Sequence, residues 1–167
     1  MTLHVFNPEH DIALAYDNKY FTAPHAGRQL RNDLDYLPVM WAEEGDYVLV
    51  ENVSSAQQHA LRLQRYGKQV NFVDKNGVER LSEQIDKVLP WGWDSSIKFQ
   101  LEQMGVKPSI LPDDEALANI RRLSNRQFSS SVLKELQESF VHPILLGKSS
   151  YVDSIIELES ILQSLGK

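Results

Sequence analysis

The sequence contains no cysteine, which excludes disulfides, thiolate metal ligands and cysteine nucleophiles together. It also lacks any run of about eighteen apolar residues, so no segment is long enough to span a membrane. The N-terminus has no basic patch followed by an apolar stretch, so no signal peptide is visible. These absences predict a soluble, cytoplasmic protein with no membrane partner.

Positive charge is scarce, since 17 lysines and arginines stand against 23 aspartates and glutamates, for a net charge of −6. A nucleic-acid-binding protein usually carries a basic stripe, and the nearest candidate here is the group of Arg121, Arg122 and Arg126. Such a group is more often a solvated helix face, so we predict no nucleic-acid partner. A hydrophobic share of 42% is still enough for a folded core.

Three glycine-based motifs of common α/β enzymes are missing. No Gly-x-Gly-x-x-Gly follows the first predicted strand, where Asn-Pro-Glu-His-Asp stands instead, so a dinucleotide site is not expected. Gly147-Lys148-Ser149 resembles the end of a P-loop, but His142 occupies the position of its first glycine. Gly-x-Ser-x-Gly is also absent, which argues against the nucleophile elbow of a hydrolase.

What the sequence does contain is an alternation of strand-like and helix-like apolar patterns. Strands are expected at 3–6, 47–50, 70–73 and 88–89. Helices are expected at 28–37, 55–66 and 95–104. We expect Pro38 to close the first of these helices, Ser54 to cap the second, Asn76-Gly77 to form a tight turn and Pro90 to end the fourth strand. This order predicts an α/β fold, a Rossmann-like, mostly parallel sheet of about four strands with helices on both faces.

The last third of the chain has a different character. Beyond Pro112 there is no strong strand pattern, and helices are expected at 113–123, 129–140 and 154–165, with a short extended link at 143–148. We therefore predict a Rossmann-like domain at 1–111 and a helical segment at 112–167.

Polar side chains gather directly after the first predicted strand, in the sequence Asn7-Pro8-Glu9-His10-Asp11. Ligands of open α/β sheets bind just past the carboxyl ends of the strands. We therefore predict that Asn7, Glu9, His10 and Asp11 bind a substrate. Local capping is the simpler explanation of Asn7 and Asp11 taken singly, but one turn has no need for so many polar groups.

A second cluster, Trp91-Gly92-Trp93-Asp94, follows the fourth predicted strand. Two indoles around a glycine can form an aromatic wall, and Gly92 lets a backbone approach closely. Trp91 is expected in the core, and capping of the next helix explains Asp94 equally well. We predict that Trp93 and Asp94 bind substrate beside the polar residues 7–11, at one edge of the sheet.

Arg28 stands near a predicted helix start, where a cation opposes the helix dipole. The small cost suggests that Arg28 pairs with Glu9, Asp11 or an anionic ligand, and the alternative is an ordinary surface arginine.

Several of these segments in combination resemble a known group of proteins. They are Phe6 to Ala15, Thr22-Ala23-Pro24, Arg28-Gln29-Leu30, Leu37-Pro38 and Leu89 to Asp94. The combination resembles the N-terminal region of a group of bacterial proteins, common in Bacteroidetes, that are related to ATP-grasp enzymes. Residues 123–127 and the helical pattern that follows them are similar to the opening helix of an ATP-grasp module.

The resemblance implies a pre-ATP-grasp domain at 1–111 that holds a small-molecule acceptor substrate, followed by the truncated start of an ATP-grasp module at 112–167. Such enzymes activate a carboxylate as an acyl phosphate, which an amine then attacks. ATP and magnesium are implied for the missing C-terminal portion, so this fragment is expected to be inactive and without a cofactor of its own. Carboxylates such as Glu9 and Asp11 would hold an amine, and Arg28 a carboxylate or phosphate. The resemblance also implies, weakly, that Arg126 lies near the nucleotide phosphates.

Two other functions fit the residues. The first is a stand-alone interaction or regulatory module, which a stop codon directly after Lys167 would favour. The second is a metal-dependent hydrolase that uses His10 and Asp11. The second needs further ligands, and the other histidines show no repeating ligand spacing.

Overall fold

The computed structural model describes residues 1–63, 69–139 and 149–165. The chain forms two compact units, residues 1–118 (unit 1) and 119–167 (unit 2), and each is described by itself. The predictions for the link at 143–148 and for the partial P-loop Gly147-Lys148 lie outside the described residues. The domain boundary expected at Leu111 stays a prediction.

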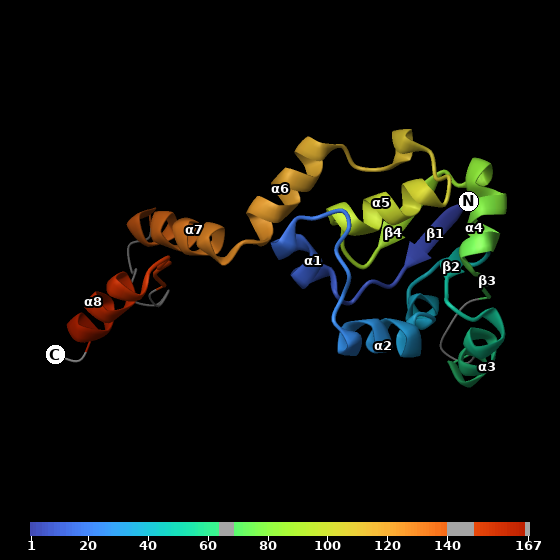
Figure 1. The fold of residues 1–167 in the computed structure, drawn as a ribbon, viewed down its shortest axis with the longest axis horizontal. Helices are drawn as coiled ribbons and strands as arrows, with labels where there is room; N and C mark the ends of the chain where they lie inside the picture. The colour runs from blue at the N-terminus through green and yellow to red at the C-terminus, as the bar shows by residue number, and fades with distance from the viewer. Residues whose placement is uncertain (64–68, 140–148, 166–167) are drawn as a thin grey trace. The chain divides into compact units, whose positions relative to one another are not determined.

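Unit 1 is built on a four-stranded parallel sheet in the order β3-β2-β1-β4 (Figure 1). The strands are β1 (Thr2–Val5), β2 (Tyr47–Leu49), β3 (Asn71–Val73) and β4 (Lys87–Pro90). In β1, one of the two inner strands, Leu3 lies opposite Tyr47 of β2 on one side and Val88 of β4 on the other. The predicted Rossmann-like α/β class is confirmed.

Helices and short 3₁₀ turns lie between these strands and after β4. They are α1 (His10–Tyr16), α2 (His25–Leu34), η1 (Leu37–Met40), α3 (Val53–Leu63), α4 (Lys75–Leu81), η2 (Ser82–Gln84), α5 (Ser95–Gln103) and η3 (Pro108–Ile110). The carboxyl ends of β1 and β4 lead into α1 and α5, and these two helices contact each other.

The sheet is buried on both faces because neighbouring strand residues point to opposite sides. Leu3, Val5 and Leu49 pack on one face with residues of α4 and α5, such as Val78 and Leu101. The other face carries a smaller cluster of Val48, Val50 and Ala56, the last from α3. Together the two clusters bury both faces of the sheet.

The tight turn predicted at Asn76-Gly77 is wrong, because these residues lie inside α4. The Asp74 side chain caps this helix by accepting a hydrogen bond from the Gly77 N–H at 2.7 Å. A capping aspartate lets the helix begin directly after β3, and the local Asn-Gly preference for a turn is overridden.

Two other helix starts also differ from expectation. Helix α2 begins at His25 and ends at Leu34, and Pro38 lies inside η1 instead of closing a helix. Proline at the first turn loses no hydrogen bond that a helix needs. Helix α3 begins at Val53, and its cap is Asn52, whose Oδ1 accepts from the Ser55 N–H, so the cap predicted at Ser54 is wrong.

Strand β4 ends at Pro90, as expected, and Pro90 is itself the last paired residue of the strand, opposite Val5. Strand β4 is an edge strand, where a residue without an N–H can be accommodated.

The remaining helices are α6 (Asp114–Ser124), which crosses from unit 1 into unit 2, α7 (Arg126–Ser139) and α8 (Ile155–Leu165). Helix α7 starts at Arg126, earlier than the predicted residue 129, after Asn125 accepts a hydrogen bond from the Gln127 N–H. Within the described ranges, no helix is both long and apolar enough to cross a bilayer.

Candidate functional site

The two predicted clusters meet at the carboxyl edge of the sheet. The Asn7 amide pairs with the backbone of Gly92 in both directions, since Nδ2 donates to the carbonyl at 2.8 Å and Oδ1 accepts from the N–H at 3.2 Å. The Trp91 N–H donates to the Val5 carbonyl at 2.7 Å and extends the contact between β1 and β4. The clusters at residues 7–11 and 91–94 therefore lie side by side, as expected when the strands before them, β1 and β4, run parallel.

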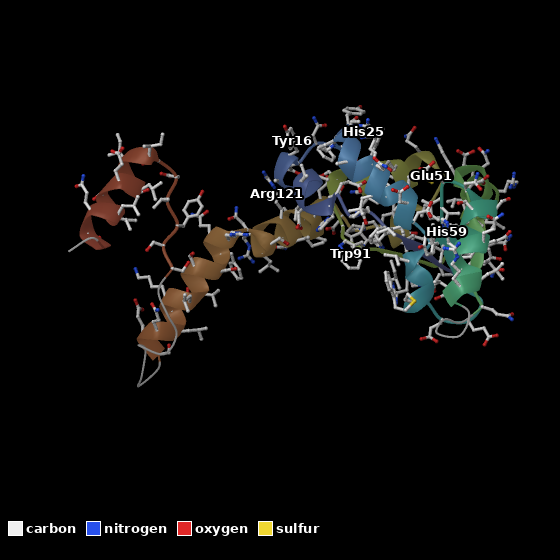
Figure 2. All side chains as sticks on the ribbon, turned by 90° about the horizontal axis from the view of Figure 1, so that it is seen from below. Tyr16, His25, Glu51, His59, Trp91 and Arg121 are labelled. Atoms are coloured by element: carbon white, nitrogen blue, oxygen red, sulfur yellow. The ribbon has the colours of Figure 1, made fainter. Side chains whose placement is uncertain are left out.

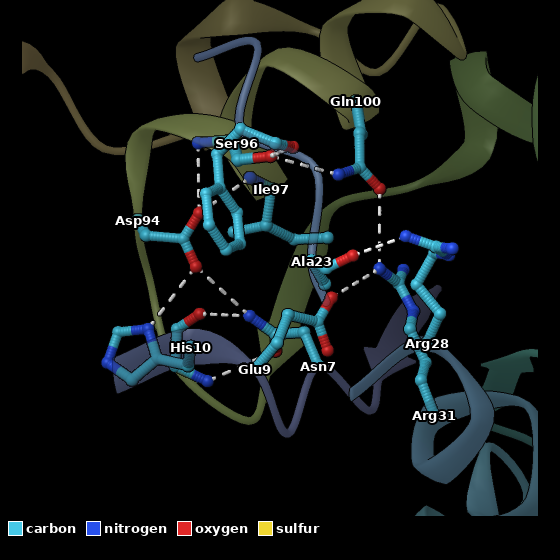
Figure 3. A network of polar contacts seen from close by, with 12 residues as sticks. Asn7, Glu9, His10, Ala23, Arg28, Arg31, Asp94, Ser96, Ile97 and Gln100 are labelled. Atoms are coloured by element: carbon cyan, nitrogen blue, oxygen red, sulfur yellow. Dashed lines mark hydrogen bonds and ion pairs between the residues drawn. The ribbon is translucent and has the colours of Figure 1, made fainter. Parts of the chain in front are cut away.

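Asp94 forms the centre of this contact. Its Oδ1 accepts from the Ser96 and Ile97 N–H groups, both at 2.9 Å, and caps α5. Its Oδ2 contacts Asn7 Nδ2 and His10 Nδ1, each at 3.3 Å (Figure 3). With 2% of its side chain exposed, Asp94 has partners on both oxygens.

Gly92 is required by the ring of His10. A Cβ atom placed on Gly92 would lie 2.3 Å from ring carbons of His10, far inside van der Waals contact. The sequence predicts that a backbone approaches this glycine, but the group that lies close to it is the side chain of His10.

A hollow of about 450 Å³ opens beside this network, a size typical of small-molecule sites. The predicted site residues Asn7, Glu9, Arg28 and Asp94 line it. The rest of the lining was not predicted and consists of Ala13, Phe21, Thr22, Ala23, Arg31, Asn32, Glu51, Ser96, Ile97 and Gln100.

Glu9 is nearly as buried as Asp94, with 9% of its side chain exposed, but its two oxygens are not both hydrogen-bonded. Its Oε1 accepts from Arg31 Nη1 at 2.9 Å. Its Oε2 is buried and has no hydrogen-bond partner among the described residues. Figure 3 shows Glu9 and Arg31 joined through one oxygen only.

The cation that pairs with Glu9 is Arg31. The ion pair predicted between Arg28 and Glu9 or Asp11 is therefore wrong. Arg28 instead donates to the Ala23 carbonyl and stays on the wall of the hollow. The two arginines lie three residues apart on α2 and share a face of the helix. This spacing is the signal that could have identified Arg31.

Gln100 and Ser96 form the opposite wall, one helical turn apart on α5. Gln100 Oε1 accepts from Arg31 at 3.4 Å, and its Nε2 donates to Ser96 Oγ at 3.1 Å. Their positions follow from the cap at Asp94, which fixes the start of α5 and the face that it turns to the hollow.

The other predicted site residues lie elsewhere. Asp11 is exposed on α1, His10 contacts Asp94 outside the lining, and neither lines the hollow. Trp93 packs against the larger core cluster. Trp91, expected in the core, is 60% exposed and contacts Phe6 and Trp41, so that prediction is wrong. Figure 2 shows Trp91 and Glu51 at separate parts of the surface.

Arg126 is exposed at the start of α7 in unit 2, and its nucleotide role stays a prediction. Among the residues that the structure describes, no three histidine, aspartate or glutamate side chains converge as metal ligands. No family model, curated protein or solved structure matches this chain.

Proposed function

We propose that unit 1 is the substrate-binding domain of an ATP-dependent carboxylate–amine ligase-like protein, of the pre-ATP-grasp type that the sequence resembles. In this function the hollow between α1, α2 and α5 holds the small-molecule acceptor substrate, and ATP and magnesium bind outside this stretch of chain. The parallel sheet supports the proposal, because its carboxyl edge is where such folds bind ligands.

The observation that carries the proposal is the buried Oε2 of Glu9, which has no protein donor in the described residues. Burying a charged acceptor without a partner costs about 1–3 kcal/mol or more. A ligand ammonium group would satisfy this oxygen, and the exposed guanidinium of Arg28 is available on the same wall for an anionic group.

Binding experiments on the 1–167 chain test the proposal. The protein amino acids, added singly at millimolar concentration, are followed by ¹H–¹⁵N NMR, and we expect at least one to shift the amide signals of Ala23, Ser96 and Gln100. Glu9→Gln removes these shifts. The matched control Glu79→Gln, on the exposed side of α4, keeps them.

ATP is the second probe, followed by calorimetry on the same chain. We expect no heat of binding, because the proposal places the nucleotide outside these residues. Tight ATP binding contradicts the proposal, and so does the absence of any amide shift at the hollow with every amino acid and every short peptide tested.

The interaction module is a second candidate, favoured by one observation in unit 2. Helix α8 leaves Ile155, Ile156 and Leu162 exposed, Ile156 by 81%. Exposed apolar residues on one helix are typical of a surface that another protein covers. Analytical ultracentrifugation of the chain and of an Ile155→Ser, Ile156→Ser variant tests this, since only the parent chain should self-associate or bind a partner.

A further inference from the structure

A second hollow, of about 520 Å³, adjoins the first along the carboxyl edge of the sheet. The two share Arg31, Glu51 and Gln100 in their walls. The first lies at the ends of β1 and β4, and the second reaches Asp74 and Lys75 after β3. Because they share these three residues, we treat the hollows as two compartments of one groove, and Arg31 lines both.

The second compartment differs from the first in the chemistry of its walls. Leu49, Phe99 and Met104 give it an apolar side. Asp74 is already occupied as the cap of α4. Lys75 is exposed and makes no ion pair within the described part of the chain. The far end of the groove thus offers an ammonium group that no described residue neutralises.

Glu9 at one end of the groove and Lys75 at the other carry charges of opposite sign, and the carboxylates of Glu51 and Asp74 also line the Lys75 end. Glu9 follows β1 and Lys75 follows β3, with β2 between them. Two strand spacings of about 4.8 Å place the carboxyl ends of β1 and β3 roughly 10 Å apart along the edge, and we take this as the approximate length of the groove. An extended chain covers about 3.5 Å per residue, so roughly three residues are needed to bridge them. A single α-amino acid is too short.

We propose that the groove binds an elongated zwitterion of tripeptide size. Its ammonium group contacts Glu9 Oε2, its apolar middle lies on Leu49, Phe99 and Met104, and its terminal carboxylate contacts Lys75. This inference rests on the proposed function of the first compartment and names the length and charge pattern of the ligand.

The tripeptide Gly-Leu-Gly is the probe, compared with its N-acetylated and C-amidated forms on the 1–167 chain. In NMR titrations we expect Gly-Leu-Gly to shift the amides of Ser96 and Gln100 and also those of Lys75 and Asn76. Loss of one charge-assisted hydrogen bond weakens binding about tenfold. Amidation and Lys75→Gln should each have this effect, and acetylation and Glu9→Gln should each have it at the other end.

The variants and the modified peptides test each other. Amidation should have no further effect on Lys75→Gln, and acetylation none on Glu9→Gln, because the partner of each charge is already absent. Lys87→Gln, an exposed lysine on β4 that lines neither compartment, should bind like the parent chain. The spectra of all variants report whether they are folded.

Three outcomes overturn the inference. If Gly-Leu-Gly shifts only the signals near Glu9, or if amidation and Lys75→Gln leave its affinity unchanged, the second compartment is not used, while the proposed function stands. If single amino acids shift the first compartment and the tripeptide shifts neither, the length is wrong. If no amino acid and no peptide binds, the proposed function fails as well.

Discussion

Two carboxylates of the same site, Asp94 and Glu9, have opposite hydrogen-bonding states. Both follow a strand, both are at least nine-tenths buried and both line the first compartment. Asp94 accepts hydrogen bonds on each oxygen and joins β1, β4 and α5. Glu9 accepts from Arg31 on one oxygen, and its other oxygen has no partner among the described residues. We infer that Asp94 positions the site and that Glu9 binds the ligand.

Substituting the two carboxylates should therefore have different effects on the free energy of unfolding. A satisfied buried carboxylate contributes to stability, and its removal leaves its donors without partners. A buried carboxylate with one unpartnered oxygen destabilises the unliganded protein, and a hydrogen-bond donor on a ligand would remove that cost. The predictions below, ordered from the largest expected effect, separate these two roles.

Asp94→Ala should lower the free energy of unfolding by about 3 kcal/mol, because it removes a helix cap, the partner of His10 Nδ1 and one of the two acceptors of Asn7 Nδ2. Urea denaturation measures the loss. The matched control is Asp113→Ala, an exposed cap of α6 that accepts only from the Ala116 N–H in the described contacts, with an expected loss of about 1 kcal/mol. Equal losses would show that the network around Asp94 adds nothing to its cap.

Gly92→Ala should cost about 2 kcal/mol, because the new methyl group would overlap the ring of His10. In the His10→Ala background the same change should cost much less, and a double-mutant cycle gives the coupling. Gly27→Ala is the control, since its Cβ would meet atoms only at 3.6 Å or beyond and α2 favours alanine. A Gly92→Ala chain as stable as the parent would place the His10 ring elsewhere.

Glu9→Gln should change stability by less than about 1 kcal/mol, although it weakens the contact with Arg31. The amide oxygen can still accept from Arg31, and the buried, unpartnered charge disappears. Thermal and urea unfolding measure this, alongside the loss of ligand binding expected above. A loss near that of Asp94→Ala would make Glu9 a structural residue and remove the contrast.

Two aspartates away from the hollow, Asp46 and Asp35, have pKa values shifted in opposite directions, so they should change stability with pH in opposite ways. Burial raises the pKa of Asp46, but hydrogen bonds from His4 and the Glu43 N–H outweigh it and lower that pKa below its ordinary value of 3.8. Stability from Asp46 should therefore be complete above pH 3.8 and be lost as the pH falls further. Burial and the charge of Glu51 raise the pKa of Asp35, so stability should fall as the pH rises from 3.8 through that raised pKa.

Unfolding measured against pH checks both signs. Asp46→Asn should flatten the decline below pH 3.8, and Asp35→Asn should flatten the decline above it. If either variant follows the parent curve in its own window, the assigned direction of that pKa shift is wrong.

Part of the candidate site could be read from the sequence because its signal is local. Asn7, Glu9 and Asp94 were predicted because each belongs to a cluster of residues that comes just after a predicted strand. Arg31 and Gln100 were not, because they lie inside helices, where an arginine or glutamine is usually solvated. Trp91 was assigned to the core by residue type, but the edge position of β4 leaves it exposed.

The sequence by itself determined the four strands, the helices α2, α3 and α5, and the polar clusters at two strand ends, but not α1 or α4. Because all four strands run parallel, those clusters had to arrive at one edge of the sheet. Only the tertiary structure decided which carboxylate is satisfied, because its partners come from segments more than 80 residues apart, as with Asn7 and Asp94. Apolar periodicity fixes which face of a strand is buried, but it does not encode which oxygen meets a donor.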